Sequence, residues 1–131
     1  MVVTRTMDRT EFSGTRVLVV EDEVLISMML VDMIEQLDCV TVGPAATIGD
    51  ARPLVSAGEY DVAVLDIHVD GASVFELADQ VVAKGVPVII ASGSGSDAIP
   101  ERFRNVGLLP KPYTLPALEA SLREARRSVR G

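Results

Sequence analysis

The sequence lacks the features of disulfide-bonded, membrane-spanning and secreted proteins. Its one cysteine, Cys39, cannot form an intrachain disulfide, and its apolar surroundings predict a buried thiol rather than a redox centre. No segment approaches the roughly 18 consecutive apolar residues that a membrane-spanning helix needs. Residues 1–15 carry scattered charges and lack the apolar centre of a secretion signal. We therefore expect a cytoplasmic protein that does not bind membranes.

Positive charge is also in short supply. Twelve Lys and Arg residues stand against 19 Asp and Glu residues, which gives a formal net charge of -7. Such a surface repels a phosphate backbone, so nucleic acid is not an expected partner. The length of 131 residues suits one domain, and the hydrophobic content of 48% is too high for a disordered chain. We expect residues 1–14 to form a flexible N-terminal extension and residues 15–131 to form one domain.

Short apolar runs alternate with stretches of helical periodicity along this domain. The runs predict strands at 16–20, 40–42, 60–65, 85–91 and 107–109. Helices are predicted at 23–37, 47–58 and 72–83, as a short or mobile helix within 97–105, and after the capping residue Thr114. A turn at Asp70 and Gly71 is predicted just before the third of these helices. This alternation predicts an α/β fold, a (βα)5 doubly wound sheet of five parallel strands.

Two of the predicted helices carry features that bear on their packing. Pro53 lies within the second, so that helix is expected to begin near Pro53 or to be kinked there. The first helix has apolar residues on most of its turns, including Met28 and Met29. We expect this methionine-rich face to pack into the core, in preference to serving as a docking surface.

Polar side chains follow four of the predicted strands. Glu21 and Asp22 come after the first, and Asp66, Ser92 and Lys111 end or follow the third, fourth and fifth. The carboxyl ends of parallel strands meet at one edge of a sheet, so these side chains should share a pocket. Carboxylates held together repel one another, and a divalent cation relieves that repulsion. Because all the ligands are oxygens, the sequence predicts a Mg²⁺ site in this pocket.

These motifs resemble the receiver domain of two-component response regulators. The likeness runs from about Thr15 to Ser128 and is carried by VLVVEDE (17–23), DVAVLDI (61–67), VIIASG (88–93) and LPKPY (109–113). The resemblance implies that residues 15–131 are a receiver domain with the flavodoxin-like strand order 2-1-3-4-5. It also implies a cis peptide bond between Lys111 and Pro112.

The resemblance implies a role for each site residue. Asp66 is the phosphoacceptor, Ser92 is the switch hydroxyl, and Lys111 contacts the phosphoryl oxygens. The Mg²⁺ ligands that it implies are Glu21, Asp22, Asp66 and the backbone carbonyl of His68. The His68 side chain and Ser94 occupy positions that tune phosphoryl lifetime across the family, although His68 fits an ordinary solvated loop residue equally well. The chain would be a signalling switch and not an enzyme, because its only chemistry is its own phosphorylation and dephosphorylation.

The sequence departs from the family pattern at two informative positions. Glu21 stands where the first acid is more often Asp, and its longer side chain changes where the carboxylate sits. Leu108 stands where an aromatic residue usually changes rotamer on activation. We therefore expect the output to depend on the order of residues 93–96 and of the following helix, instead of on an aromatic switch.

The resemblance also implies partners. The input is a sensor histidine kinase or a histidine phosphotransfer protein. Because nothing follows the last predicted helix, we expect no output domain, and action either on a downstream protein target or as a phosphate sink. The family's usual surface for targets and for homodimers is formed by helix four, strand five and helix five.

Other functions fit the sequence less well. The main alternative is a pseudo-receiver that binds partners without phosphorylation. A metal-dependent phosphohydrolase is disfavoured because His68 stands where that class has a second aspartate. A flavin site of the flavodoxin type is disfavoured because the acids at 21–23 would repel the phosphate of the cofactor.

Overall fold

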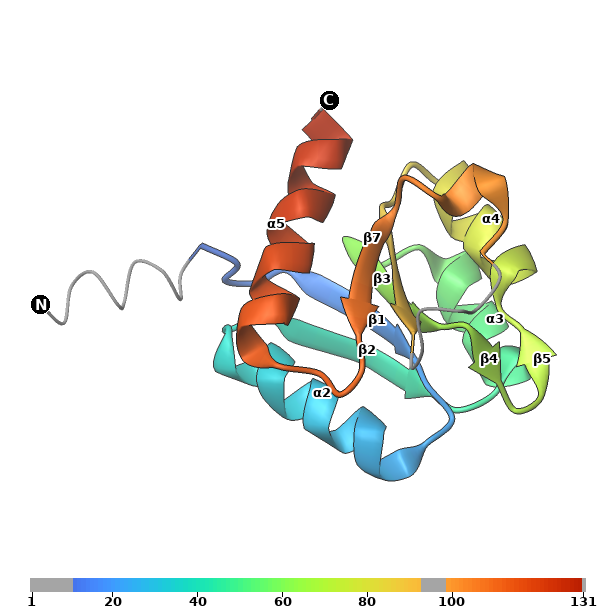
Figure 1. Cartoon of the computed structure of the whole chain (residues 1–131), viewed down its shortest axis with the longest axis horizontal. Coiled ribbons are helices and arrows are strands. Elements are labelled where there is room, and N and C mark those ends of the chain that lie inside the picture. Colours follow the sequence, from blue (N-terminus) through green and yellow to red (C-terminus); the bar gives the residue numbers. More distant parts are fainter. Residues whose placement is uncertain (1–10, 93–98, 131) are drawn as a thin grey trace, which may run out of the picture.

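A parallel sheet forms the centre of the molecule (Figure 1). The structure is a computed structural model that describes residues 11–92 and 99–130, without the side chains of Ser92 and residues 128–130. Within these residues the sheet has five strands: β1 (Arg16–Val20), β2 (Val40–Ala45), β3 (Val62–Asp66), β6 (Val88–Ser92) and β7 (Gly107–Pro110). Their order is β2-β1-β3-β6-β7, and every neighbouring pair is parallel. The predicted order 2-1-3-4-5 is confirmed.

Helices cover both faces of the sheet. The described residues form α2 (Val24–Gln36), α3 (Ile48–Ala57), α4 (Phe75–Ala83), α5 (Leu115–Arg130) and a short 3-10 helix, η1 (Glu101–Phe103). Figure 1 shows α2 and α5 on one face and α3 and α4 on the other. Among the described helices, none has the length and apolar character needed to cross a bilayer.

Alternation along the strands supplies a core to each face. In β1, Val17 and Val19 pack with residues of α2 and α5, whereas Leu18 and Val20 pack with residues of α3 and α4. All four side chains are buried. Cys39 is buried on the α2 side, where burial raises the pKa of its thiol to about 11, which agrees with an inert core residue. The doubly wound architecture is therefore confirmed.

The second strand and its helix differ from the prediction. Strand β2 continues to Ala45 instead of ending at Val42, because the ladder to β1 skips two residues between the pairs Leu18–Val42 and Val20–Ala45. Proline has no N–H to donate, and Pro44 is one of the two skipped residues. Helix α3 begins at Ile48 and not near Pro53, because the Thr47 hydroxyl accepts the Asp50 N–H at 3.0 Å and caps its first turn.

A small hairpin lies between β3 and α4. Strands β4 (His68–Val69) and β5 (Ala72–Ser73) are antiparallel and are joined by Asp70 and Gly71. Both turn residues have positive φ, 53° and 80°, as a two-residue type I′ turn requires. The predicted Asp-Gly turn is confirmed. The helix predicted from Ala72 begins only at Phe75, because residues 72–73 pair with β4.

The first helix is packed differently from the prediction. The buried residues of α2 are Ser27, Leu30 and Ile34, which recur at helical spacing and face the sheet. The apolar residues at its start point away from the core: Val24 is 68% exposed, Leu25 76%, Met28 61% and Met29 47%. The expectation that the methionine-rich face is core was wrong. We call these four residues the α2 patch.

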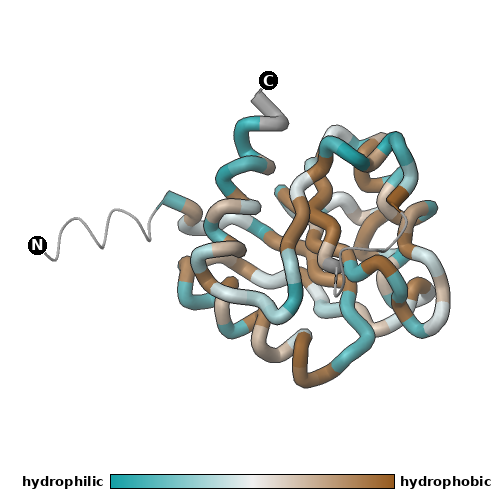
Figure 2. The backbone as a smooth tube through the Cα atoms, viewed as in Figure 1, coloured by the Kyte–Doolittle hydropathy of each residue, from teal (hydrophilic) through white to brown (hydrophobic). Residues whose placement is uncertain are grey.

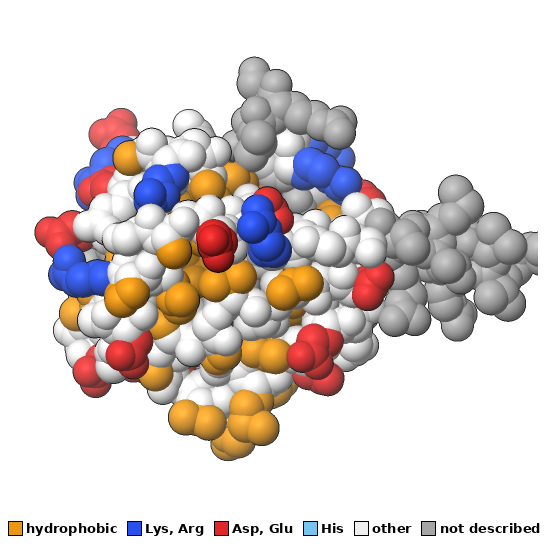
Figure 3. Space-filling view, turned by 180° about the vertical axis from the view of Figure 1, so that it is seen from behind, with side chains coloured by type: hydrophobic (Ala, Val, Ile, Leu, Met, Phe, Trp, Pro, Cys, Tyr) orange, Lys and Arg blue, Asp and Glu red, His pale blue; other side chains and the backbone are white. Residues whose placement is uncertain are grey.

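The apolar character of this part of the molecule is visible in two views, one of the backbone and one of the surface. Figure 2 shows a hydrophobic stretch at the start of α2, and Figure 3 shows hydrophobic side chains protruding at the corresponding lower edge of the molecule. A cluster of this kind is unusual on a free surface, where apolar residues are normally scattered singly.

Glu11 and Phe12 pack against the last helix. Phe12 is 2% exposed and belongs to the same core cluster as Leu118 and Leu122. The Glu11 carboxylate accepts from Arg123 at 2.9 Å and from Arg126 at 2.6 Å, and both guanidinium groups lie over the Phe12 ring. The expected flexible extension 1–14 thus includes two residues that pack against α5, and Ser13 and Gly14, which are exposed, bond to Asp38. Residues 1–10 lie outside the described part of the chain.

The buried ring of Phe12 leads to a prediction about stability. Replacing Phe12 with Ala should lower the free energy of unfolding by about 3 kcal/mol, because it empties a filled position in the core. Met28→Ala is the matched control and should change this free energy by less than about 0.5 kcal/mol, since Met28 is exposed. Urea denaturation of both variants would measure the difference. Equal effects would contradict the packing of Phe12.

Candidate functional site

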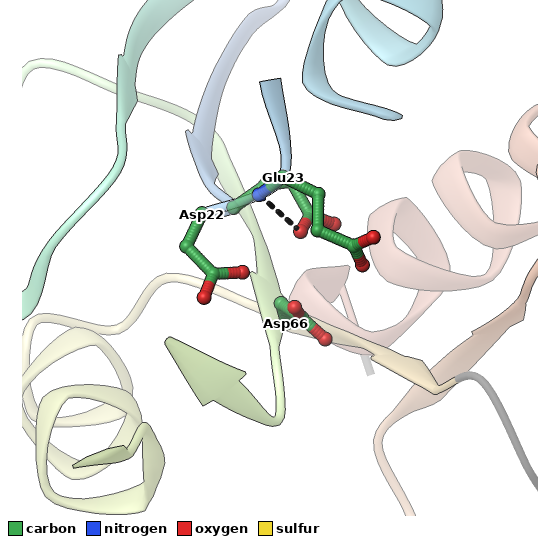
Figure 4. A group of neighbouring side chains, drawn as sticks. Asp22, Glu23 and Asp66 are labelled. Atoms are coloured by element: carbon green, nitrogen blue, oxygen red, sulfur yellow. Dashed lines mark hydrogen bonds between the residues drawn. The ribbon is translucent and has the colours of Figure 1, made fainter. Parts of the chain in front are cut away.

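The carboxyl ends of β1 and β3 bring four acids together. Val20 lies opposite Leu65 in the ladder between these strands, so the residues that follow on β1 stand beside Asp66, the last residue of β3. One carboxylate oxygen from each of Glu21, Asp22, Glu23 and Asp66 lies within 4.8 Å of the others. Figure 4 shows Asp22, Glu23 and Asp66 grouped at this edge of the sheet. Three of these acids, Glu21, Asp22 and Asp66, were predicted to share the pocket, whereas Glu23 was not.

Lys111 reaches this cluster from the edge of the sheet that β7 forms. It follows β7, which is separated from β3 by β6. Its Nζ atom lies 3.1 Å from Glu21 Oε1, 3.3 Å from Asp66 Oδ1 and 3.5 Å from Glu23 Oε1. The peptide bond between Lys111 and Pro112 is cis, as expected. The structure therefore unites Lys111 with the predicted acids.

Glu21 is the most enclosed of the acids, at 2% exposed. Besides Lys111, its carboxylate accepts the Glu23 N–H on Oε2 and the Tyr113 hydroxyl on Oε1, each at 3.1 Å. Burial, followed by the negative charge of Glu21, raises the pKa of Tyr113, so the phenol remains a hydrogen-bond donor. Tyr113 was not predicted as a site residue, although it lies inside the motif that contains Lys111.

The predominance of negative charge perturbs the pKa values in the pocket. Burial, together with the charge of Glu21, raises the pKa of Asp66 to about 6, and Lys111 offsets part of this rise. Burial alone would lower the pKa of Lys111, but its hydrogen bonds and the charges of Glu21 and Asp66 raise it. The ammonium group is thus charged, and it is outnumbered by carboxylates. Hard oxygen donors with excess negative charge fit a divalent cation such as Mg²⁺.

Asp22 connects the pocket to the hairpin. Its Oδ2 atom accepts the backbone N–H of Asp70 at 2.8 Å, which ties the end of β1 to the turn between β4 and β5. His68 begins β4 with an exposed side chain, two residues after Asp66. The role predicted for its carbonyl oxygen stays a prediction.

The fourth predicted site residue is placed only by its backbone. Ser92 ends β6, directly after Ala91, which pairs with Asp66. The backbone thus comes to the same edge of the sheet as the acids. The Ser92 hydroxyl lies outside the described atoms, and Ser94 and the 93–96 segment lie outside the described residues.

The fold and the position of the acids define an α/β protein of the flavodoxin-like kind, with a carboxylate and lysine pocket at the carboxyl edge of its sheet. A family model, the response regulator receiver domain, matches residues 17–123. The chain belongs to this family, whose members act in two-component signalling.

Individual proteins agree with this assignment. The transcriptional regulatory protein TcrA of Mycobacterium tuberculosis is 32% identical over 122 residues, covering 88% of this chain and 47% of that protein. The chain therefore spans about half the length of the curated relatives that it matches. The solution structure of SdrG from Sphingomonas melonis Fr1 has a TM-score of 0.79 and 35% identity, covering 86% of this chain and 97% of that one. The response regulator PhyR from Brucella abortus has a TM-score of 0.74 and 26% identity, covering 95% of this chain and 52% of that one.

The raised pKa of Asp66 predicts that this residue destabilises the fold at neutral pH. In the unfolded chain Asp66 ionises near its ordinary pKa of 3.8, whereas the folded protein holds the proton until about pH 6. Stability therefore falls as the pH rises between these two values, and the loss is complete above the higher one. Without divalent cations, Asp66→Asn should raise the free energy of unfolding at neutral pH by about 1 to 3 kcal/mol.

The gain should shrink as the pH falls and disappear below about pH 4. Urea denaturation in the presence of a chelator, repeated across this pH range, would measure it. Asp32→Asn is the control, because Asp32 is exposed on α2 and its replacement should have little effect at any pH. A loss of stability in Asp66→Asn at neutral pH would contradict the prediction.

Proposed function

We propose that this chain is a phosphorylation-activated switch in which Asp66 accepts a phosphoryl group. The observation that carries the proposal is the position of Asp66: it ends a central strand, is 8% exposed, and has Lys111 Nζ at 3.3 Å. An acceptor needs an oxygen that reaches the pocket mouth and a cation to balance incoming negative charge. Asp66 and Lys111 meet both needs.

The chemistry follows from these two residues. A carboxylate oxygen of Asp66 forms a bond to phosphorus while the bond from phosphorus to the donor breaks, and the donor leaves with that electron pair. The pKa of about 6 leaves Asp66 mostly ionised at neutral pH, so it can act as the nucleophile. Lys111 stabilises negative charge on the transferred oxygens. The product is an acyl phosphate on Asp66.

The acids of the pocket would hold Mg²⁺. Asp22 and Asp66 are the proposed direct ligands, with Glu21 and the backbone carbonyl of His68 completing the protein's share, and the oxygen cluster of Glu21, Asp22, Glu23 and Asp66 supports this set. When bound, Mg²⁺ would offset the charge of the phosphoryl oxygens and the repulsion among the carboxylates. Each ligand comes from the carboxyl edge of the sheet.

The response to phosphorylation is proposed to begin at the end of β6. A phosphoryl group adds negative charge and acceptor oxygens, to which the Ser92 hydroxyl would donate. Ser92 and Asp66 lie at the ends of adjacent strands, which supports this contact. After β6, only residues 101–103 form a helix among the described residues 99–106, in keeping with the expected short helix. Leu108 of β7 is 53% exposed and has no aromatic ring to move.

The partner that supplies the phosphoryl group is proposed to dock on the α2 patch. A sensor histidine kinase or a histidine phosphotransfer protein must bring its phosphohistidine to Asp66 and therefore has to cover the rim of the pocket. The patch begins one residue after Glu23, and its side chains are apolar and exposed. Apolar surface of this kind gives a docking protein most of its binding free energy.

The output is proposed to pass through another surface. A groove between α4, η1, β7 and α5 includes Val82, Phe103 and Leu108 in its lining. It contains the strand and the last helix that the family resemblance associates with targets and homodimers. A downstream protein or a second copy of the chain would bind there; alternatively, the chain would act as a phosphate sink without a target.

The acceptor role predicts a covalent adduct. Incubation with Mg²⁺ and acetyl phosphate should add the mass of one phosphoryl group to the wild-type protein, because Asp66 supplies the nucleophile and the acids supply the metal site. Asp66→Ala should remove the adduct, whereas Asp32→Ala, which alters an exposed acid of α2, should retain it. Intact-protein mass spectrometry measures both. A protein that forms no adduct with any small phosphodonor would instead be a pseudo-receiver that binds partners without phosphorylation.

The docking surface predicts a separation between small and large phosphodonors. The double variant Leu25→Gln, Met28→Gln should react with acetyl phosphate at the wild-type rate, because it changes neither charge nor any acid of the pocket. Transfer from a phosphorylated kinase or phosphotransfer protein that serves the wild type should fall by about tenfold or more, since it removes apolar anchors. Val82→Gln, at a 49% exposed position on α4, is the control and should retain transfer. Unimpaired transfer to the double variant would place the docking surface elsewhere.

A further inference from the structure

The Glu21 carboxylate has an uneven set of partners. Its Oε1 atom receives both the Lys111 ammonium and the Tyr113 hydroxyl, each at 3.1 Å. Among the described residues, its Oε2 atom receives one donor, the N–H of Glu23. A carboxylate oxygen has two lone pairs. The described contacts thus occupy both lone pairs of Oε1 and one of the two lone pairs of Oε2.

We propose that Tyr113 is a positioning residue that holds Glu21 by Oε1 and leaves Oε2 as the oxygen available to a divalent cation. This inference rests on the proposed function, because it assigns Glu21 to the Mg²⁺ site. A glutamate has one more rotatable bond than an aspartate, so its carboxylate is harder to hold at one place. The phenol hydroxyl supplies the restraint that the longer side chain requires.

The surroundings of Tyr113 make the restraint rigid. The residue is 5% exposed and belongs to the core cluster that contains Leu109 of β7 and Leu118 of α5. Its ring is therefore fixed by packing, and only its hydroxyl reaches the acids. A hydrogen bond from a fixed group to a metal ligand sets where the ligand's oxygens lie, and the loss of such a bond typically weakens metal binding by about 10- to 100-fold.

The same bond means that Lys111 is not the only side chain that holds Glu21 among the described residues. Without the phenol, Lys111 would be the only side-chain donor to Glu21 among the contacts described, and it also serves Asp66 at 3.3 Å. With Tyr113 sharing Oε1, Lys111 can turn toward negative charge near Asp66 while Glu21 stays in place. Tyr113 thus supports both the metal ligand and the lysine.

Tyr113→Phe is the direct test, because it removes only the hydroxyl. Isothermal titration of the full chain with MgCl2 should show affinity about tenfold weaker than that of the wild type. Tyr60→Phe is the matched control: Tyr60 is also buried, and its hydroxyl donates to the Val55 carbonyl at 3.1 Å on the other face of the sheet. Its affinity should remain within about twofold of wild type.

A second measurement does not depend on the folding of Tyr113→Phe. The chain has two tyrosines and no tryptophan, so in Tyr60→Phe the intrinsic fluorescence comes from Tyr113 alone. Hydrogen bonding to a carboxylate changes tyrosine emission, so MgCl2 should alter the emission of this protein with the same midpoint as the titration. Adding Glu21→Gln to Tyr60→Phe should reduce that response.

The outcomes are distinct. Wild-type protein that binds no Mg²⁺ would overturn the metal site of the proposed function and the role of Tyr113 with it. Wild-type binding together with undiminished affinity in Tyr113→Phe would overturn only the role of Tyr113. Mg²⁺ binding to Tyr60→Phe without any change in emission would do the same. Weaker binding in Tyr113→Phe, with a saturable emission change in Tyr60→Phe, would support it.

Discussion

The repulsion between the carboxylates of Glu21 and Asp66, balanced by Lys111, is the interaction around which this molecule is organised. The sheet forces the acids together, because β1 and β3 are neighbours and both end at the pocket. Burial of the two strands on both faces supplies the free energy that holds them there. One ammonium group cannot neutralise several carboxylates, so the pocket retains an attraction for cations. The fold thus stores an electrostatic imbalance that a ligand can relieve.

Three other parts of the fold contact the acids of this pocket. Asp22 binds the hairpin at Asp70, Glu21 binds Tyr113 next to α5, and Asp66 stands beside the end of β6. A change of charge at Asp66 is therefore only one or two contacts away from the hairpin, from α5 and from β6. Such short routes suit the phosphorylation switch proposed for Asp66.

Local signals account for the parts of the structure that could be predicted. Strands buried on both faces appear as continuous apolar runs, and a polar residue directly after each run marks the carboxyl edge of the sheet. Glu21, Asp66 and Lys111 were located in this way, and the structure brings them together. The Asp70–Gly71 turn was also visible, because few dipeptides accept positive φ at both positions.

The features that were missed depend on contacts between distant residues. Helix α2 is apolar around most of its circumference, so its sequence does not say which side faces the sheet, and Leu25 and Met28 proved to be exposed. The sequence around Phe12 does not indicate that Arg123 and Arg126 of α5 lie over its ring. The hydroxyl of Tyr113 meets a carboxylate 92 positions earlier in the chain, which no periodicity encodes.

The exposed start of α2 also constrains how the protein behaves at high concentration. An apolar patch favours association between copies, whereas a net charge of -7 keeps them apart at low ionic strength. Salt shortens the range of that repulsion and leaves the patch unchanged. The solubility of this protein therefore depends on a balance between attraction at the α2 patch and repulsion from its net charge. Ionic strength determines which of the two is stronger.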